Sequence, residues 1–244
     1  MPQPLASWLA DRRHRPEAGR PAGTRGPMAR KLWGPVLAAV VVGALALWAL
    51  AAGGGDDICP EEPRRLAGHD FDNAVLQGEN FACADLRGAT LQYAELDDAD
   101  LRNADLRNAD LYEADVFDAD LSGADLSGAN LSGAVFNRSN LEDANLTRAD
   151  LGAGNFEPAN LAGADLRWAD LEGTIFGKAD LRGVDLRGAH FEYTIFHGSN
   201  LRGARFDDID LTGPEWENSW KNTTCPDGHV TDHARESCAG HLSP

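Results

Sequence analysis

Basic side chains are scarce in this chain. Its 244 residues include 22 lysines and arginines against 39 aspartates and glutamates, which gives a formal net charge of −17. Proteins bind nucleic acids largely through lysine and arginine contacts to phosphate. A chain this acidic is poorly suited to such contacts, and we expect no nucleic-acid partner.

The chain also lacks the motifs of common catalytic sites. It has no nucleophile elbow, phosphate-binding loop, dinucleotide fingerprint or zinc-protease motif. Aspartate is abundant, but it recurs at a regular spacing that a solvated surface explains without acid–base catalysis. His69, His190 and His197 have no evident partner for a catalytic triad. We therefore expect a protein that is not an enzyme and that uses no cofactor and no metal.

The middle of the chain has neither the helical period of three and four nor the strand period of two. From Leu66 to Leu211, every fifth residue is leucine or phenylalanine, with Val116 as the one exception. This makes thirty consecutive units without an insertion. A fixed short period indicates a repeat architecture in which neighbouring units must stack to bury their apolar residues.

Each unit has an inside and an outside. The residue two positions before the central leucine or phenylalanine is nearly always small, as at Ala84 and Ala89, and in extended backbone it points to the same side as the centre. The residue between them points outward and is aspartate or asparagine in twenty-one of the thirty units. The last two residues of a unit are often glycine, asparagine, aspartate or serine, which favour a turn.

This pattern, as in Ala99-Asp100-Leu101 and Ala124-Asp125-Leu126, resembles the pentapeptide repeat family. The resemblance implies an all-β fold, a right-handed quadrilateral parallel β-helix with four units per coil, over residues 66–213. Four units per coil place residues twenty apart above one another, and the phenylalanines show this spacing. The predicted internal ladder consists of Phe136, Phe156, Phe176 and Phe196.

An apolar segment precedes the repeats. Residues 32–52 carry no charge and, as a helix, match the thickness of a bilayer core. Residues 1–31 hold seven of the basic residues, so the positive-inside rule keeps this basic, disordered segment cytoplasmic and exports the rest. We expect a single-pass anchor in the cytoplasmic membrane; the alternative is a cleaved signal peptide ending near Ala49-Leu50-Ala51, which releases a secreted protein. Met1 and Met28 are both candidate starts.

Four cysteines flank the repeats. In an exported chain an even number suggests disulfides, and we expect Cys59 to pair with Cys83 and Cys225 with Cys238. Residues 53–65 then form a linker and N-terminal cap, and residues 214–244 form a C-terminal cap in which Trp216 and Trp220 lie on one face of a short helix. A zinc site is the alternative for this tail, built from ligands of suitable type and spacing: Cys225, His229, His233, Cys238 and His241.

The outward positions divide the predicted rod into four sides. Three are expected to be acidic and equivalent, with arginines at one register, such as Arg87 and Arg107, that pair with aspartates. The fourth carries apolar residues and is the candidate surface for an unknown protein partner. Its residues are Phe117, Val135, Ile175 and Ile195.

These features predict a non-enzymatic, exported repeat scaffold that acts in protein–protein interaction or envelope structure. A homodimer through a rod end is a further expectation, since open β-helix ends are adhesive. The alternative function is mimicry of a DNA duplex. The resemblance raises it, because some cytoplasmic pentapeptide repeat proteins bind a type II topoisomerase in this way, but export would separate this chain from that target.

Overall fold

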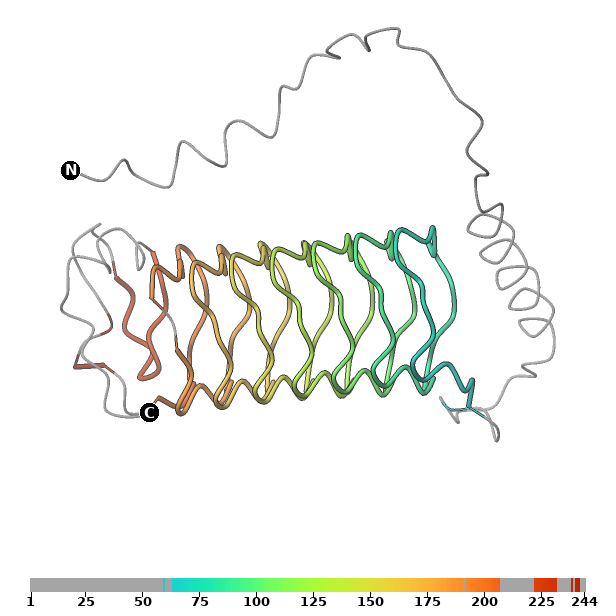
Figure 1. Ribbon diagram of the computed structural model, residues 1–244. Helices are drawn as coiled ribbons and strands as arrows, with labels where there is room; N and C mark the ends of the chain where they lie inside the picture. Colours follow the sequence, from blue (N-terminus) through green and yellow to red (C-terminus); the bar gives the residue numbers. More distant parts are fainter. Residues whose placement is uncertain are drawn as a thin grey trace, which may run out of the picture. The chain divides into compact units, whose positions relative to one another are not determined.

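The computed structural model describes residues 59, 63–190, 192–206, 222–231, 238, 240 and 241. Within them, residues 63–206 wind into a stack of similar coils, running from cyan to orange in Figure 1. The part of the chain so described contains no helix long and apolar enough to cross a membrane. The expected membrane segment 32–52, and Trp216 and Trp220, lie outside the described residues.

The coils stack in a register of twenty residues. Single-residue parallel β-bridges join each outward position to the one twenty residues later, as in Asp85 to Asp105 and Asp105 to Asp125. A ladder of this kind runs along each of four sides. Each side thus contributes one bridged residue per coil rather than a long strand, and four units per coil, expected from the resemblance, is what the structure has.

Backbone hydrogen bonds hold successive coils together at several points in each unit. Leu106 N donates to Asp125 O at 2.7 Å, Asn108 N donates to Ser127 O at 3.1 Å, and Asp125 N donates to Ala104 O at 2.9 Å. One further bond closes the turn within a unit, from Ala109 N to Leu106 O at 3.0 Å. The buried backbone polar groups of the coils are therefore paired as burial requires.

The corners are turns with one left-handed residue. The second residue after each described centre has a positive φ, for example 57° at Cys83 and 62° at Trp168, with Pro158 as the exception, while the residue before it does not. A positive φ at only the third residue of a four-residue turn is the type II pattern, which favours glycine and asparagine. Glycine or asparagine fills many of these corners, as the sequence predicted, but aromatic and charged residues occupy others.

The core contains two residues from every unit. The described central residues from Leu76 to Leu201 are almost fully buried, and so are most of the alanines two positions before the centres, whereas Ala189 and Phe206 are only partly buried. Four buried phenylalanines on one side form the predicted ladder. Their ring centroids are 4.8 Å apart for Phe136 and Phe156, 5.4 Å for Phe156 and Phe176, and 5.6 Å for Phe176 and Phe196.

Hydroxyl residues replace alanine at several small positions, and their polar groups are satisfied. Thr174 Oγ1 donates to Leu151 O at 2.9 Å, and Thr194 Oγ1 donates to Leu171 O at 2.8 Å. Ser139 Oγ donates to Val116 O in the same way. Each of these three hydroxyls therefore bonds a carbonyl of the preceding coil, which removes the cost of burying it.

The C-terminal tail adds one more unit to the stack. Thr224 forms a parallel bridge with Asn200, and Leu201 N donates to Thr224 O at 2.7 Å, so Cys225 stands where a central leucine would. Val230 then pairs antiparallel with Thr224 and covers this edge. Residues 223–227 thus extend the β-helix beyond 213, the limit expected from the five-residue pattern. The five-residue pattern does not predict this unit, because the step from Asn200 to Thr224 is twenty-four residues instead of twenty.

Two disulfides lie at the two ends of the stack, Cys59–Cys83 and Cys225–Cys238, each with a Cα–Cα distance of 5.4 Å. These are the pairs that the sequence suggested. The first ties the segment that enters the rod to a corner of the first coil, and the second ties the added unit to the tail that follows it. The chain has no free cysteine.

Candidate interaction surfaces

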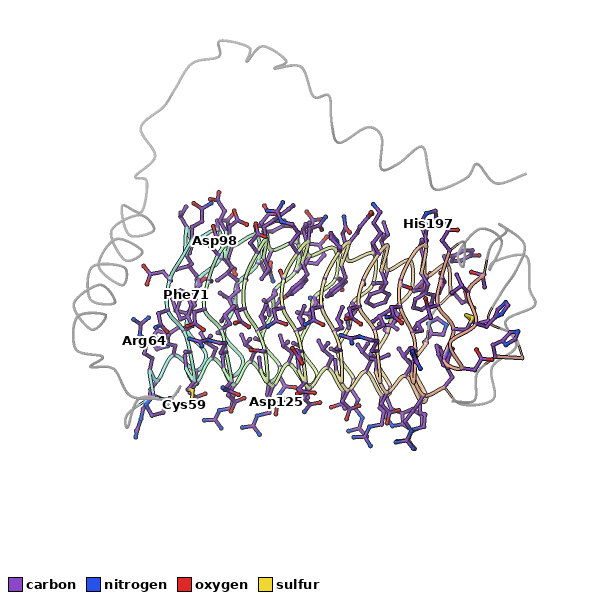
Figure 2. The ribbon with its side chains drawn as sticks, turned by 180° about the vertical axis from the view of Figure 1, so that it is seen from behind. Cys59, Arg64, Phe71, Asp98, Asp125 and His197 are labelled. Atoms are coloured by element: carbon purple, nitrogen blue, oxygen red, sulfur yellow. A yellow bond between two sulfur atoms is a disulfide. The ribbon has the colours of Figure 1, made fainter. Side chains whose placement is uncertain are left out.

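The rod has four lateral sides, which we name by the first central residue on each: the Leu66, Phe71, Leu76 and Phe81 sides. Because the units follow one another around the coil, the Leu66 side is opposite the Leu76 side. Asp125 of the Leu66 side and Asp98 of the Leu76 side are labelled at opposite edges of the rod in Figure 2. The sides differ in charge more than the sequence suggested.

The Leu66 side is the exception in this acidic chain. Between residues 65 and 206 it holds seven arginines and five aspartates, a net charge of +2, while Arg64 occupies the inward position of the first unit with its guanidinium 5.7 Å from the centre of the Phe81 ring. The expectation that three sides are acidic and equivalent is therefore wrong for this side. The sequence shows the spacing of the aspartates, but the net charge of each side can be summed only when residues twenty apart are assigned to the same side. The arginines are Arg65, Arg87, Arg107, Arg148, Arg167, Arg187 and Arg205.

Four arginines on this side, Arg87, Arg107, Arg167 and Arg187, each bind the aspartate two residues before them. Arg107 Nε lies 2.7 Å from Asp105 Oδ1 and its Nη2 lies 2.6 Å from Asp105 Oδ2. Hydrogen bonding to Arg107 is the main reason why the pKa of Asp105 is lowered. The predicted pairing of arginines with aspartates is present, but the closest partner belongs to the same unit. The same two-pronged geometry occurs at Arg87–Asp85, Arg102–Asp100, Arg167–Asp165, Arg182–Asp180 and Arg187–Asp185.

The Phe71 side is the most acidic. Its described residues include eight carboxylates and no lysine or arginine. Tyr93 is exposed at one corner and its ring meets Tyr112 edge-on, with centroids 5.6 Å apart. The carboxylates are Asp70, Asp72, Asp110, Glu113, Asp150, Asp170, Glu172 and Glu192.

The Phe81 side carries a polar ladder. Asn140 Nδ2 donates to Asp120 Oδ1 at 3.1 Å, and Asn160 Nδ2 donates to Asn140 Oδ1 at 2.9 Å. Side chains at one register therefore bond to the same position in the next coil. Such ladders reinforce stacking and explain why both asparagine and aspartate occur at the outward position.

The Leu76 side holds the predicted interaction residues. Ile175 and Ile195 are bridged neighbours in adjacent coils, and both are half-buried. Val135 is separated from them by Asn155. The guanidinium carbon of Arg138 lies over the Phe117 ring, 5.7 Å from the ring centroid. The apolar strip is therefore shorter than a whole side, and its continuous part is the isoleucine pair.

Asp115, on the same side, has a raised pKa. Partial burial is the main cause, followed by the negative charges of Asp97 and Glu95. A raised folded-state pKa means that the stabilising form is the protonated one. This contribution is present below the unfolded value of about 3.9 and is lost as the pH rises through the higher folded value. At neutral pH the ionised Asp115 therefore destabilises the fold.

We expect Asp115→Asn to increase the free energy of unfolding at neutral pH by a few tenths of a kcal/mol, the scale of exposed substitutions. The gain should vanish in acid, where Asp115 is protonated. Denaturant titrations at two pH values measure it. Asp105→Asn is the matched control with the opposite sign, since Arg107 lowers the pKa of Asp105 and its contribution is lost as the pH falls. A loss of stability for both variants at neutral pH would contradict this assignment.

One exposed aromatic residue had no place in the predicted sites. Trp168 stands at a corner of the Leu66 side and is 63% exposed, the highest value among the large apolar side chains described. A corner position filled by tryptophan instead of glycine or asparagine was the available signal. Trp168 differs from the other corner residues in that it lies on the one side of the rod whose described residues have a net positive charge.

The C-terminal tail does not form the alternative zinc site. Both candidate thiolates are joined in the Cys225–Cys238 disulfide. The rings of His229 and His241 are stacked with centroids 4.3 Å apart, and His241 Nδ1 lies 2.6 Å from Asp227 Oδ2. The residues that the structure describes include no cluster suited to a metal ion. His233 lies outside them.

The fold and the surfaces together define a solenoid of five-residue units with four chemically distinct sides. The chain belongs to the pentapeptide repeat family: the model of pentapeptide repeats matches in eight copies, over residues 80–116, 117–152, 139–177 and 179–213. It is thus a pentapeptide repeat scaffold. No curated protein matches this chain.

Several solved structures are similar. A trypsin-treated variant of QnrB1, a plasmid-mediated fluoroquinolone resistance protein, is 20% identical with a TM-score of 0.53, over 62% of this chain and 76% of that one. HetL from the cyanobacterium Nostoc sp. strain PCC 7120, involved in regulating heterocyst differentiation, is 25% identical over 76% and 97% of the two chains, with a TM-score of 0.28. A pentapeptide repeat protein from the thylakoid lumen of Arabidopsis thaliana is 27% identical over 75% and 94%, with a TM-score of 0.22. The likeness to QnrB1 concerns the fold alone.

Proposed function

We propose that this protein is a non-enzymatic scaffold exported across the cytoplasmic membrane, anchored by residues 32–52, and that its rod binds a protein partner outside the cytoplasm. The observation that carries the proposal is the pairing of all four cysteines, one disulfide at each end of the rod. Disulfides persist in oxidising compartments and are rare in the cytosol. The basic N-terminal segment and the apolar run give the same orientation.

A scaffold role suits the way the rod is built. Its interior is filled by side chains, and its ends are tied by disulfides, so the lateral sides are the surfaces offered to a partner. Pairing with arginine stabilises the ionised carboxylates on those sides, and this lowers their pKa values, as for Asp105 with Arg107. Regular ion pairs of this kind support the coil, and repeat rods serve many unrelated roles.

The partner-binding surface we propose is the Leu76 side, at Ile175 and Ile195. These half-buried isoleucines form the continuous apolar part of that side. Ile175→Asp with Ile195→Asp should abolish partner binding while leaving the melting temperature nearly unchanged, measured with a partner crosslinked in intact cells. Asn140→Asp with Asn160→Asp adds the same two charges at the same unit position on the Phe81 side. Equal binding by both double variants would exclude the isoleucine surface.

The alternative, mimicry of DNA for a type II topoisomerase, has less support. A duplex mimic needs unneutralised negative charge along the rod. The Leu66 side has a net charge of +2 between residues 65 and 206, and on the Phe81 side Asp100 and Asp180 are bound by arginines. Inhibition of a type II topoisomerase by the purified full chain would favour this alternative.

Export has a direct test. Alkaline phosphatase fused after Pro244 should be active in bacterial cells, and thiol-trapping reagents should find all four cysteines oxidised. Deleting residues 32–52 from the fusion should abolish both results, because the rod would then remain in the reducing cytosol. An inactive fusion with reduced cysteines in the intact chain would overturn export.

A further inference from the structure

Trp168 is held in an unusual position for an exposed tryptophan. It occupies a corner with a positive φ, and its ring lies against the backbone of Gly188, the same corner one coil later. A Cβ at Gly188 would lie 2.4 Å from the ring, so the arrangement depends on the glycine. The ring is thus fixed on the rod while most of its surface remains open to solvent.

Basic residues surround this tryptophan. Arg148 occupies the same corner one coil earlier, Arg167 precedes Trp168 in the chain, and Arg187 has the position of Arg167 in the next coil. Arg148 makes no ion pair with the residues that the structure describes. Arg205, at the C-terminal end of this side, is 3.7 Å from Asp185, which Arg187 already grips. Between residues 145 and 206 this side therefore combines an exposed indole with four arginines against two aspartates.

We propose that the Leu66 side lies on the anionic lipid headgroups of the membrane that tethers the chain, with Trp168 at the lipid–water interface. The inference rests on the anchored form of the proposed function. Tryptophan favours the headgroup region, where its ring is partly buried and its N–H stays hydrated. Arginine is attracted to a bilayer surface that carries anionic lipid, and the inference requires such lipid in the leaflet that faces the exported rod. No other side of the rod joins a net positive charge to an exposed tryptophan among the described residues.

The tether makes a weak surface attraction sufficient. Only residues 53–62 separate the proposed membrane segment from the described start of the rod. A short linker converts docking into an intramolecular event with a high effective concentration. The acidic sides do not prevent it, because exposed charges more than about 8 Å from the surface are largely screened at physiological salt. The tether then keeps the rod at the membrane, and the charge difference between its sides determines which side faces the lipid.

This orientation agrees with the proposed partner site. The Leu76 side is opposite the Leu66 side, so Ile175 and Ile195 face away from the lipid and remain open to a protein. The strongly acidic Phe71 side, which lies between the Leu66 and Leu76 sides, would then be roughly perpendicular to the membrane surface. An acidic protein is the competing occupant of the arginine side, but it offers no interface region for the tryptophan.

The test uses the full chain reconstituted in phosphatidylcholine vesicles with and without brominated phosphatidylglycerol. Bromine quenches tryptophan at the interface, and subtracting the signal of Trp168→Phe isolates residue 168 from the other tryptophans. We expect loss of most of this difference signal in the anionic vesicles, with recovery in high salt. Matched neutral vesicles carrying brominated phosphatidylcholine should leave it unquenched. Retention of the protein after a carbonate wash shows that the tether is in place.

A charge-reversal pair checks the role of the arginines. Arg148→Glu with Arg205→Glu should weaken docking by about fivefold or more per arginine, the effect of one basic residue at an anionic surface. Arg138→Glu with Lys178→Glu makes the same charge change on the Leu76 side and should leave quenching unaltered.

Each other outcome overturns the inference. Unquenched Trp168 in a carbonate-resistant chain refutes it while leaving the anchor intact. Equal quenching in neutral vesicles refutes its electrostatic basis. Shielding of Trp168 by soluble polyglutamate but not by lipid would assign the side to an acidic protein. Removal of the chain by carbonate would overturn the anchor and this inference together.

Discussion

Replacing Phe156 with alanine lowers the free energy of unfolding by about 3–5 kcal/mol, the range for a fully buried phenylalanine. Phe156 is the second rung of a ladder, with ring centroids 4.8 Å from Phe136 and 5.4 Å from Phe176. Its removal takes away two ring contacts and leaves a cavity between coils. The coils cannot close around that cavity, because backbone hydrogen bonds on both sides fix their spacing.

Phe156→Leu is the matched control for this prediction. Leucine is the central residue in most units, including Leu151 and Leu161 on either side in the sequence, so the coil accepts its shape. We expect a loss of about 1–1.5 kcal/mol, the usual cost of an apolar exchange that keeps much of the volume. Urea or guanidinium titration measures both variants. A loss near zero for leucine would show that the ladder adds nothing beyond local filling, and equal losses for alanine and leucine would contradict the cavity argument.

The sequence predicted the coil well because two periods act on the same residues. The five-residue period places Leu or Phe and a small residue inside, and the structure buries both, as at Leu126 and Ala124. The spacing of Phe136 and Phe156 by twenty then predicted which residues stack, and their rings do so. The same repeat therefore predicts both the local conformation and the contacts between coils, because each residue packs against the residue at the equivalent position one coil away.

The surface was harder to predict for a physical reason. Whether a side is acidic depends on summing charges across seven coils, and no local pattern reports that sum. Arg148 and Trp168 look like ordinary corner residues in their own units. They become neighbours of Arg167 and Arg187 only in the stack.

The end of the rod shows a different limit. Thr223, Thr224 and Cys225 fill the small, outward and central positions of a unit, with Thr223 Oγ1 donating to Phe196 O at 2.6 Å. A polar residue and a cysteine replace the alanine and leucine that mark a unit in the sequence. The path from Asn200 also contains four extra residues. Both the residue types and the spacing of this unit therefore differ from the repeat, although its backbone stacks on the preceding coil as the other units do.

Reducing the Cys225–Cys238 disulfide should destabilise this last unit by about 3 kcal/mol, the loop-closure value in the chain-entropy model for a separation of this size. The loss should be local. The edge is held by Leu201 N bonding Thr224 O at 2.7 Å and by the antiparallel pairing of Thr224 with Val230. Once the tail is freed, that pairing has no covalent support, and the final coil opens before the centre of the rod does.

Amide hydrogen exchange resolves this difference along the rod. In a Cys59→Ser, Cys83→Ser chain, a reductant acts on the C-terminal disulfide alone and leaves the core position of Cys225 filled. We expect faster exchange at Leu201, Gly203 and Thr224, with unchanged protection at Leu121, which donates to Asn140 O at 2.6 Å in the middle of the stack. The reciprocal Cys225→Ser, Cys238→Ser chain should respond to the reductant at the first coil instead. A uniform rise along the rod would mean that the ends and the centre unfold together, because nearest-neighbour stacking then couples every coil more strongly than the disulfide closes its own.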